Sequence, residues 1–192
     1  YIEHSGFEGK ILGAAASGSQ GGLLGAISGG GSTIKIESSY ANFSKIEGSG
    51  GNIGGLIGFV PGAIGNVEIE DSYVLIDPTE LNAADDLPNS STSGGLVGGQ
   101  SFTGATIKNS FVDGLVADLG PSVVPISSLG GTITSGSTFY LGSATGGIVA
   151  TPHAGGLTYS TLATDPNFKY DNGPGGSGFT KDASGKTVLS WQ

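Results

Sequence analysis

Four acidic residues in one polar segment are the side chains of this chain that could most readily do acid–base chemistry. The segment, Asp77–Ser93, contains two prolines and carries the carboxylates of Asp77, Glu80, Asp85 and Asp86. Two carboxylates can cleave a glycosidic bond only when they are held at a fixed separation in contrasting environments. A polar segment that contains prolines indicates neither condition, so we expect no catalysis at these residues.

Other catalytic patterns are also weak, and the sequence predicts that the protein is not an enzyme. Serine, histidine and aspartate are all present, but no Gly-x-Ser-x-Gly motif lies on a predicted strand-to-helix turn. Glycine-rich stretches that resemble phosphate loops are not followed by a helix. The chain has no cysteine, which excludes a thiol nucleophile and a cysteine zinc site.

Metal binding is left with one open possibility, a weak calcium site. Calcium takes oxygen ligands, and no spaced Asp-x-Asp-x-Asp-Gly loop is present to supply them in the usual way. The remaining candidates are the carboxylates of Glu37, Glu70, Asp85 and Asp86. Histidine occurs at only two positions, His4 and His153, so a histidine metal site is not expected. No cofactor is predicted, with calcium as the alternative.

Composition and charge exclude two kinds of partner. Lysine and arginine together number 7 against 16 aspartates and glutamates, and the net charge is −9. Nucleic-acid binding requires clustered basic residues, so we do not expect it. No apolar run approaches the ~20 residues that a membrane-spanning helix needs. Glycine contributes 38 of the 192 residues without a period of three, which indicates tight turns and close backbone contacts.

The segments that would position these side chains form a sequence repeat. The motif Gly-Gly-Leu-x-Gly begins at Gly21, Gly54 and Gly94, and an alternating apolar segment follows each copy. Equivalent isoleucines in the alternating segments, at intervals of 34, 33 and 38 residues, are Ile2, Ile36, Ile69 and Ile107. A period in this range is typical of solenoids, in which each unit covers the open face of the next.

The alternating segments predict β-strands with one buried face. In one copy that face would carry Val67, Ile69, Asp71, Tyr73 and Leu75. Across the copies, the alternation predicts two stacked inward columns. One consists of Ile36, Ile69 and Ile107, and the other of Tyr40, Tyr73 and Phe111. The glycine doublets predict close approach of backbones. The leucines that follow them predict a third inward column of Leu23, Leu56 and Leu96.

Polar and charged residues also form columns. We predict an inward polar column of His4, Ser38, Asp71 and Asn109 and an outward column of Ser5, Ser39, Ser72 and Ser110. We interpret them as a bend in each unit, where short polar side chains bond the backbone, with a ligand-binding ladder as the alternative. Stacked units would place outward charges ~4.8 Å apart. We therefore expect Lys35 beside Glu68, and Lys108 over Glu70, to offset the repulsion between Glu37 and Glu70.

These patterns predict an all-β stack of glycine-rich coils over residues 1–154, with units near 1–33, 34–66, 67–104 and 105–154. The tail, 155–192, is expected to be an irregular aromatic C-terminal cap that closes an exposed end of the stack. Two insertions, Asp77–Ser93 and Leu119–Ser128, contain prolines that keep them out of the strand ladder. Insertions of this kind often carry recognition.

The repeat resembles the GLUG repeat of large bacterial surface and secreted adhesin-like proteins. The resemblance rests on Gly-Gly-Leu-[Ile/Val/Leu]-Gly, followed 17 to 19 residues later by [Asp/Asn/Ser]-Ser-[Tyr/Phe], and covers roughly residues 1 to 115. Gly130-Gly131-Thr132 departs from the pattern because the leucine is missing. The resemblance implies a right-handed β-solenoid, similar to a β-helix, with a role in adhesion or surface assembly and no catalytic site.

The functional hypothesis is an extracellular structural or adhesive β-solenoid, either a cell-surface adhesin module or the subunit of a fibre or filament. Its partners would be other copies of itself, through end-to-end or lateral assembly, or a cell-surface glycan or protein. A carbohydrate-binding or carbohydrate-cleaving β-helix is the alternative. Most aromatic residues lie at predicted inward columns or in the tail, which disfavours that alternative.

Overall fold

The fold is known from a computed structural model. It describes residues 1–13, 18–28, 30–48, 52–60, 66–76, 93–100, 104–113, 124–126, 132–135, 138–141 and 178–192. Within these ranges the regular secondary structure consists entirely of β-strands, as the alternating sequence pattern predicts. The prediction of an all-β fold is thus confirmed. A search of the same ranges finds no helix with the length and apolar character to span a membrane.

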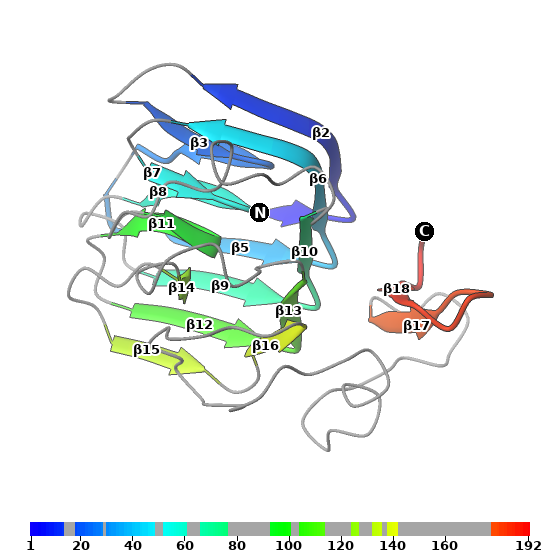
Figure 1. The fold of residues 1–192 in the computed structure, drawn as a ribbon. Coiled ribbons are helices and arrows are strands. Elements are labelled where there is room, and N and C mark those ends of the chain that lie inside the picture. The colour runs from blue at the N-terminus through cyan, green and yellow to red at the C-terminus, as the bar shows by residue number, and fades with distance from the viewer. Residues whose placement is uncertain are drawn as a thin grey trace.

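Most strands belong to three parallel sheets, to which successive repeats contribute equivalent strands (Figure 1). The first sheet has the order β1 (Ile2–Glu3), β5 (Thr33–Glu37), β9 (Asn66–Glu70), β12 (Gly104–Lys108) and β15 (Thr132–Ser135). The second has the order β2 (Gly6–Gly13), β6 (Tyr40–Gly48), β10 (Tyr73–Ile76), β13 (Ser110–Asp113) and β16 (Thr138–Leu141). Neighbours in each sheet therefore come from neighbouring repeats.

The third sheet holds the Gly-Gly-Leu-x-Gly motifs. Its path runs β3 (Ser19–Gly21), β7 (Asn52–Gly54), β11 (Ser93–Gln100), β8 (Ile57–Val60) and β4 (Leu24–Ala26). The long strand β11 pairs with both β7 and β8, and also with β14 (Val124–Ile126). The motif therefore forms two short strands in the first two units and one continuous strand in the third.

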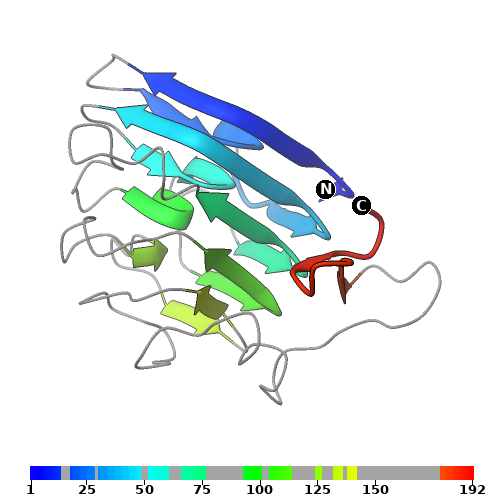
Figure 2. The ribbon, with the colours of Figure 1, turned by 45° about the vertical axis from the view of Figure 1, so that its right-hand side comes forward.

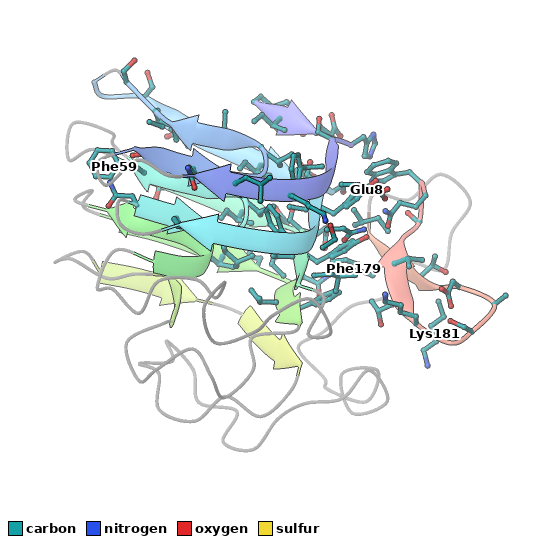
Figure 3. The ribbon with its side chains drawn as sticks, turned by 45° about the horizontal axis from the view of Figure 1, so that its top comes forward. Glu8, Phe59, Phe179 and Lys181 are labelled. Carbon is teal, nitrogen blue, oxygen red and sulfur yellow. The ribbon has the colours of Figure 1, made fainter. Side chains whose placement is uncertain are left out.

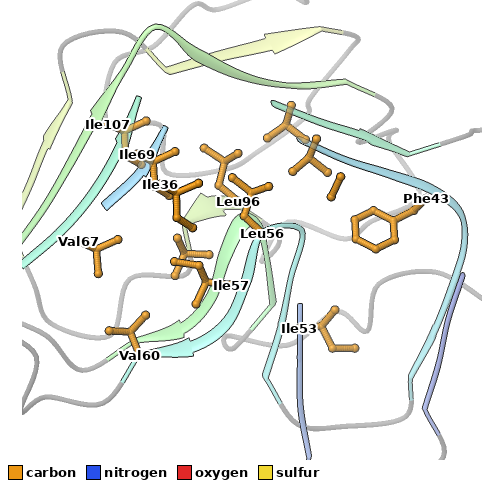
Figure 4. Packing of buried hydrophobic residues seen from close by; sticks show 14 residues of the cluster. Ile36, Phe43, Ile53, Leu56, Ile57, Val60, Val67, Ile69, Leu96 and Ile107 are labelled. Atoms are coloured by element: carbon orange, nitrogen blue, oxygen red, sulfur yellow. The ribbon is translucent and has the colours of Figure 1, made fainter. Parts of the chain in front are cut away.

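The strands of the first sheet are paired without any shift along the repeat. Ile2 pairs with Ile36, Ile36 with Ile69, and Ile69 with Ile107. Ile36, Ile69 and Ile107 are almost completely buried and lie in one row (Figure 4). The pairing therefore places equivalent residues next to one another although their intervals differ, and their side chains exclude water together.

The core lies between the three sheets. Leu56 and Leu96 are fully buried and lie beside the isoleucine row in Figure 4, whereas Leu23 in the first unit is half-buried. The second sheet contributes Ala41, Phe43, Val74 and Val112 to the same cluster. Tyr40, Tyr73 and Phe111 do not belong to this cluster, so the predicted inward position of the aromatic column is corrected below.

The glycines of the motif are required by close backbone contacts. A Cβ atom on Gly54 would lie within 3.0 Å of the Ile57 carbonyl and of the Gly98 amide, a separation that Cβ atoms essentially never have. A Cβ on Gly55 would overlap the Gly95 carbonyl and the Val74 side chain. Each unit therefore turns sharply here while touching the next, and only glycine leaves room for both backbones.

The C-terminal residues form a hairpin of their own. Strands β17 (Phe179–Lys181) and β18 (Thr187–Leu189) pair in antiparallel fashion, and among the described strands they pair only with each other. Figure 2 shows this hairpin, in red, at the side of the stack near the starts of the second-sheet strands. The described part of the tail thus lies along the side of the stack. The sequence had instead suggested a cap that closes one end.

Candidate functional site

The corner between the first and second sheets carries most of the polar side chains singled out from the sequence. In each of four units one residue there has a left-handed backbone, with φ of 47° at His4, 45° at Ser38, 47° at Asp71 and 44° at Asn109. Residues other than glycine rarely adopt this conformation, and short polar residues such as asparagine and aspartate tolerate it best. The column interpreted as a bend is a bend in the structure.

The bend reverses which side of the chain faces the core. Side chains alternate only while the backbone remains extended, and one left-handed residue interrupts that alternation. In an uninterrupted strand, buried residues are separated by an even number of positions. Ile36 is buried before the bend and Ala41 and Phe43 after it, so the separation across the bend is odd. Tyr40, Tyr73 and Phe111 consequently lie on the outer side of the second sheet. Tyr73 and Phe111 are buried, as predicted, but they are buried against the C-terminal hairpin and not in the core between the sheets.

The serine column also differs from its predicted outward position, because Ser39, Ser72 and Ser110 are completely buried. Each hydroxyl donates a hydrogen bond of 2.8 Å to the carbonyl two residues earlier, for example Ser72 Oγ to Glu70 O. Each also accepts a 3.2 Å bond from the serine N–H of the preceding unit, as from Ser39 N to Ser72 Oγ. The column is a hydrogen-bonded serine ladder that joins successive units.

Ser72→Ala is expected to lower the free energy of unfolding by ~1–3 kcal/mol, because the buried Ser39 N–H loses its acceptor. Denaturant unfolding followed by circular dichroism measures the change. The control is Ser32→Ala, since Ser32 is exposed and substitutions at such positions usually change stability by less than ~0.5 kcal/mol. Equal stability losses in the two variants would contradict the ladder.

An aromatic column stands on the outer face next to the serine ladder. The rings of Tyr40 and Tyr73 stack with centroids 5.4 Å apart and planes at 12°. Those of Tyr73 and Phe111 stack at 5.2 Å and 6°. The first unit has Gly6 at the equivalent position, and a Cβ there would overlap the Tyr40 ring. Among the side chains that the structure describes, the column therefore begins at Tyr40 and runs through three units.

The C-terminal hairpin covers this aromatic column. The Phe179 ring lies 5.3 Å from that of Phe111 and 6.2 Å from that of Tyr73, and Figure 3 places Phe179 where the hairpin meets the stack. Trp191 lies 5.8 Å from Tyr40 and 5.6 Å from the His4 ring. The tail therefore supplies an aromatic ring beside the unit in which the column has glycine.

Directed hydrogen bonds hold the hairpin in place. Trp191 Nε1 donates to the carbonyl of Ser38 at 2.8 Å, which joins the tail to the bend. The Tyr73 hydroxyl donates to Gln192 Oε1 at 2.9 Å, and the Leu189 N–H donates to the same oxygen. Sequence reasoning missed this contact. The available signals were the missing ring at Gly6 and the single tryptophan of the chain, in its penultimate position.

Tyr73 is expected to make the folded protein less stable in alkali. Burial of the ring raises the pKa of its hydroxyl from 10.0 to about 12. The unfolded chain then loses this proton first, so the contribution of Tyr73 is fully present below pH 10 and is lost as pH rises from 10 to about 12. Denaturant unfolding at several pH values measures this loss.

The matched variant is Tyr73→Phe, which keeps the ring and removes the ionisable group. Other tyrosines also titrate in this range, so the informative quantity is the difference between parent and variant. We expect the variant to lose less stability than the parent between pH 10 and 12. Parallel curves for the two proteins would show that Tyr73 has an ordinary pKa.

The acidic residues Glu37 and Glu70 lie on the outer face of the first sheet, where they face Lys35. Lys35 Nζ is 2.8 Å from Glu37 Oε2 and 4.0 Å from Glu70 Oε2. The Tyr1 hydroxyl donates to the same Glu37 oxygen at 2.6 Å. The bonds from Lys35 and then from Tyr1 lower the pKa of Glu37 below its ordinary value. Lys35 thus offsets the charge of both carboxylates.

These contacts differ in detail from the predicted charge pairs. The strand register places Lys35 opposite Glu68 and Lys108 opposite Glu70, as expected. The ion pairs of Lys35, however, are made with Glu37 and Glu70. Within the described ranges, no group of three or more histidine, aspartate or glutamate side chains could hold a metal ion. The other calcium candidates, Asp85 and Asp86, lie outside those ranges.

Several predicted features fall on residues that the structure does not describe. They include most of the two insertions, Asp77–Ser93 and Leu119–Ser128, of which Ser93 and Val124–Ile126 are described. Val124–Ile126 forms β14 and pairs with β11, so the prediction that prolines keep this insertion out of the ladder is wrong for these residues. They also include His153 and the tail aromatics Tyr159, Phe168 and Tyr170. Their assignment to recognition loops and to a cap therefore remains a prediction.

The described corner joins units to one another and joins the tail to the stack. Its serine hydroxyls bond the backbones of adjacent units, and its aromatic rings stack from one unit to the next. Glu37 is bound by Lys35 and Tyr1. Comparisons of the chain with protein-family models, with curated proteins and with solved structures find no match. The contacts of this corner hold the units and the tail together.

Proposed function

We propose that the chain is a right-handed β-solenoid that serves as an extracellular structural or adhesive module, either part of a surface adhesin or the subunit of a filament. The observation that supports this proposal is the unshifted pairing of Ile2, Ile36, Ile69 and Ile107 across four units. When every unit rests on the next through equivalent contacts, the length of the stack increases with the number of repeats. The resemblance to GLUG repeats favours the same role.

The difference between inward and outward residues in how far they vary from unit to unit also supports this role. One row of paired inward positions keeps isoleucine through four units of the first sheet. In the neighbouring inward row, Ile34 pairs with Val67. The outward neighbours change from Lys35 to Glu68 to Thr106 at paired positions. Backbone and core contacts therefore hold the units together, while the outer surface is free to vary. Such a surface suits recognition or lateral contact with little effect on stability.

The proposed location is tested by immunogold electron microscopy of the cells that produce the protein, with an antibody raised against the purified chain. We expect gold particles on the outside of intact cells or along fibres attached to them. Permeabilised cells serve as the control for antibody access. Labelling that appears only after permeabilisation would show that the protein is retained inside the cell and would overturn the proposal.

A glycan-binding module is the second candidate, and Trp191 is the observation that favours it. Its side chain is 36% exposed and lies beside His4 and Tyr40, so part of an aromatic surface remains open to solvent. Binding of the parent chain to a glycan array, lost in Trp191→Ala and kept in His4→Ala, would support this candidate. A parent chain that binds no glycan would remove it. A reducing-sugar assay with any bound glycan separates binding from cleavage.

A further inference from the structure

We propose that the aromatic column is a docking site for the C-terminal hairpin of a second copy of this chain, so that neighbouring stacks can exchange hairpins. In the structure the hairpin of the same chain occupies the column (Figure 3). The inference rests on the proposed structural role and names a lateral contact through which copies would join. Exchange of an identical element costs little, because the same contacts form within one copy or between two.

The column keeps its shape through contacts within the stack. Tyr40, Tyr73 and Phe111 stack on one another across three units. Tyr73 N donates to the carbonyl of Ser39 in the preceding unit at 3.0 Å. Phe111 N donates in the same way to Ser72 O at 3.1 Å. The stack by itself therefore presents these rings to a hairpin of any origin.

The hairpin is held together by hydrogen bonds of its own. Strands β17 and β18 pair with each other, and the Ser190 N–H donates to Gly178 O at 2.9 Å. At the turn between the strands, Asp182 Oδ1 accepts bonds from Ser184 N at 2.8 Å and from Lys186 N at 2.9 Å. All of these bonds move with the hairpin, so its transfer from one stack to another breaks none of them.

The described contacts between the hairpin and the stack are made by hairpin side chains. Phe179 packs against two rings of the column. Trp191 Nε1 donates to Ser38 O, and Gln192 Oε1 accepts from the Tyr73 hydroxyl. The column thus receives an aromatic ring, an indole N–H and an amide oxygen in one fixed arrangement. A second copy brings this arrangement, whereas an arbitrary peptide or a sugar does not.

Chain length does not confine the hairpin to its own column. Residues 142–177 join β16, the last described strand of the stack, to the hairpin. At ~3.3 Å per extended residue, a segment of this length spans about 120 Å at most. Docking within one copy is intramolecular and therefore dominates in dilute solution. Exchange gains weight as copies become crowded, as they would in a fibre or a surface array.

The test is a complementation experiment with two full-length variants. Phe179→Ala keeps the column and loses the ring that anchors its own hairpin, whereas Tyr73→Ala keeps the hairpin and loses the centre of its own column. Neither variant can dock its hairpin normally within one copy, but the hairpin of the second fits the column of the first. In sedimentation velocity we expect each variant alone to be monomeric. The equimolar mixture should form a one-to-one dimer and associate at least ~10-fold more strongly than either variant alone, because only the mixed contact buries all the rings.

Fluorescence identifies the contact that forms in the mixture. When the Phe179→Ala chain also carries Trp191→Phe, the only tryptophan belongs to the hairpin of the Tyr73→Ala chain. Its emission should move to shorter wavelength on mixing, as the indole leaves water for Tyr40 and the Ser38 carbonyl. The matched control is the double variant Phe179→Ala/Tyr73→Ala in place of Tyr73→Ala, which brings no intact hairpin and should not associate.

Two results would overturn the inference. One is a mixture that remains monomeric, and the other is equally strong association with the double variant. Circular dichroism and thermal melting show whether each variant folds. If Tyr73→Ala does not, Tyr40→Ala takes its place, because it removes the ring beside Trp191 and leaves the buried rings of the column. These outcomes are independent of the immunogold experiment, so exchange can fail while the proposed surface location stands.

Discussion

Gly54→Ala is expected to prevent the chain from folding into its native stack. The added Cβ would overlap the Ile57 carbonyl and the Gly98 amide, and both are backbone atoms held by neighbouring strands. Neither can move aside without disturbing the pairing of β11 with β7 and β8, so relief costs hydrogen bonds as well as packing. We expect a loss of at least ~4 kcal/mol, a large part of the stability of an ordinary domain.

Far-UV circular dichroism and resistance to proteolysis measure the outcome for Gly54→Ala. The matched control is Gly18→Ala, because a Cβ at Gly18 would meet no atom within 4 Å. The control should fold and change stability by no more than ~1 kcal/mol, since alanine there mainly restricts the unfolded chain. A Gly54→Ala protein with the parent's unfolding midpoint would refute the close backbone approach on which the arrangement of units depends.

Phe179→Ala is expected to release the C-terminal hairpin from the stack while the three sheets persist. Phe179 is fully buried and contacts both Tyr73 and Phe111. Truncating a buried phenylalanine costs ~3–5 kcal/mol. Within the described ranges, β17 and β18 pair only with each other, so no strand pairing found there with the stack could compensate. Its attachment therefore depends on side chains.

Fluorescence reports this release directly, because Trp191 is the only tryptophan in the chain. We expect the emission of Phe179→Ala to shift to longer wavelength as the indole leaves Tyr40 and the Ser38 carbonyl, while the far-UV spectrum of the sheets remains. Thr180→Ala is the control on the neighbouring, half-exposed position of the same strand. Unchanged emission in Phe179→Ala would show that Phe179 is not needed to hold the hairpin.

The repeat interval was the most informative feature of the sequence. The similar spacing of Ile2, Ile36 and Ile69 predicted that they would be neighbours in one sheet, and the strands pair at these residues. The glycine doublets predicted close backbone contact, and a side chain at Gly54 or Gly55 would overlap the backbone of another unit. Both predictions succeed for one reason, because a repeated local sequence adopts a repeated local structure and each copy becomes its neighbour's environment.

The orientation of the aromatic and serine columns could not be obtained in this way. The predicted orientations assume that side chains continue to alternate between the two faces through Asp71. The left-handed backbone at Asp71 instead reverses the face on which the later residues lie. Histidine, serine, aspartate and asparagine also occupy ordinary turns, so their identity does not reveal the sign of φ. One torsion angle per unit therefore decides whether Tyr73 faces the core or the tail.

The amino-acid sequence by itself determined that the chain is built from β-strands, which residues are equivalent in successive units, and where glycine is indispensable. These properties follow from local spacing and from the space that a backbone occupies. Only the tertiary structure decided which side of the sheet carries the aromatic column and what covers it. The covering contacts join residues as far apart as Ser38 and Trp191, and no repeat relates the tail to the strands that it covers.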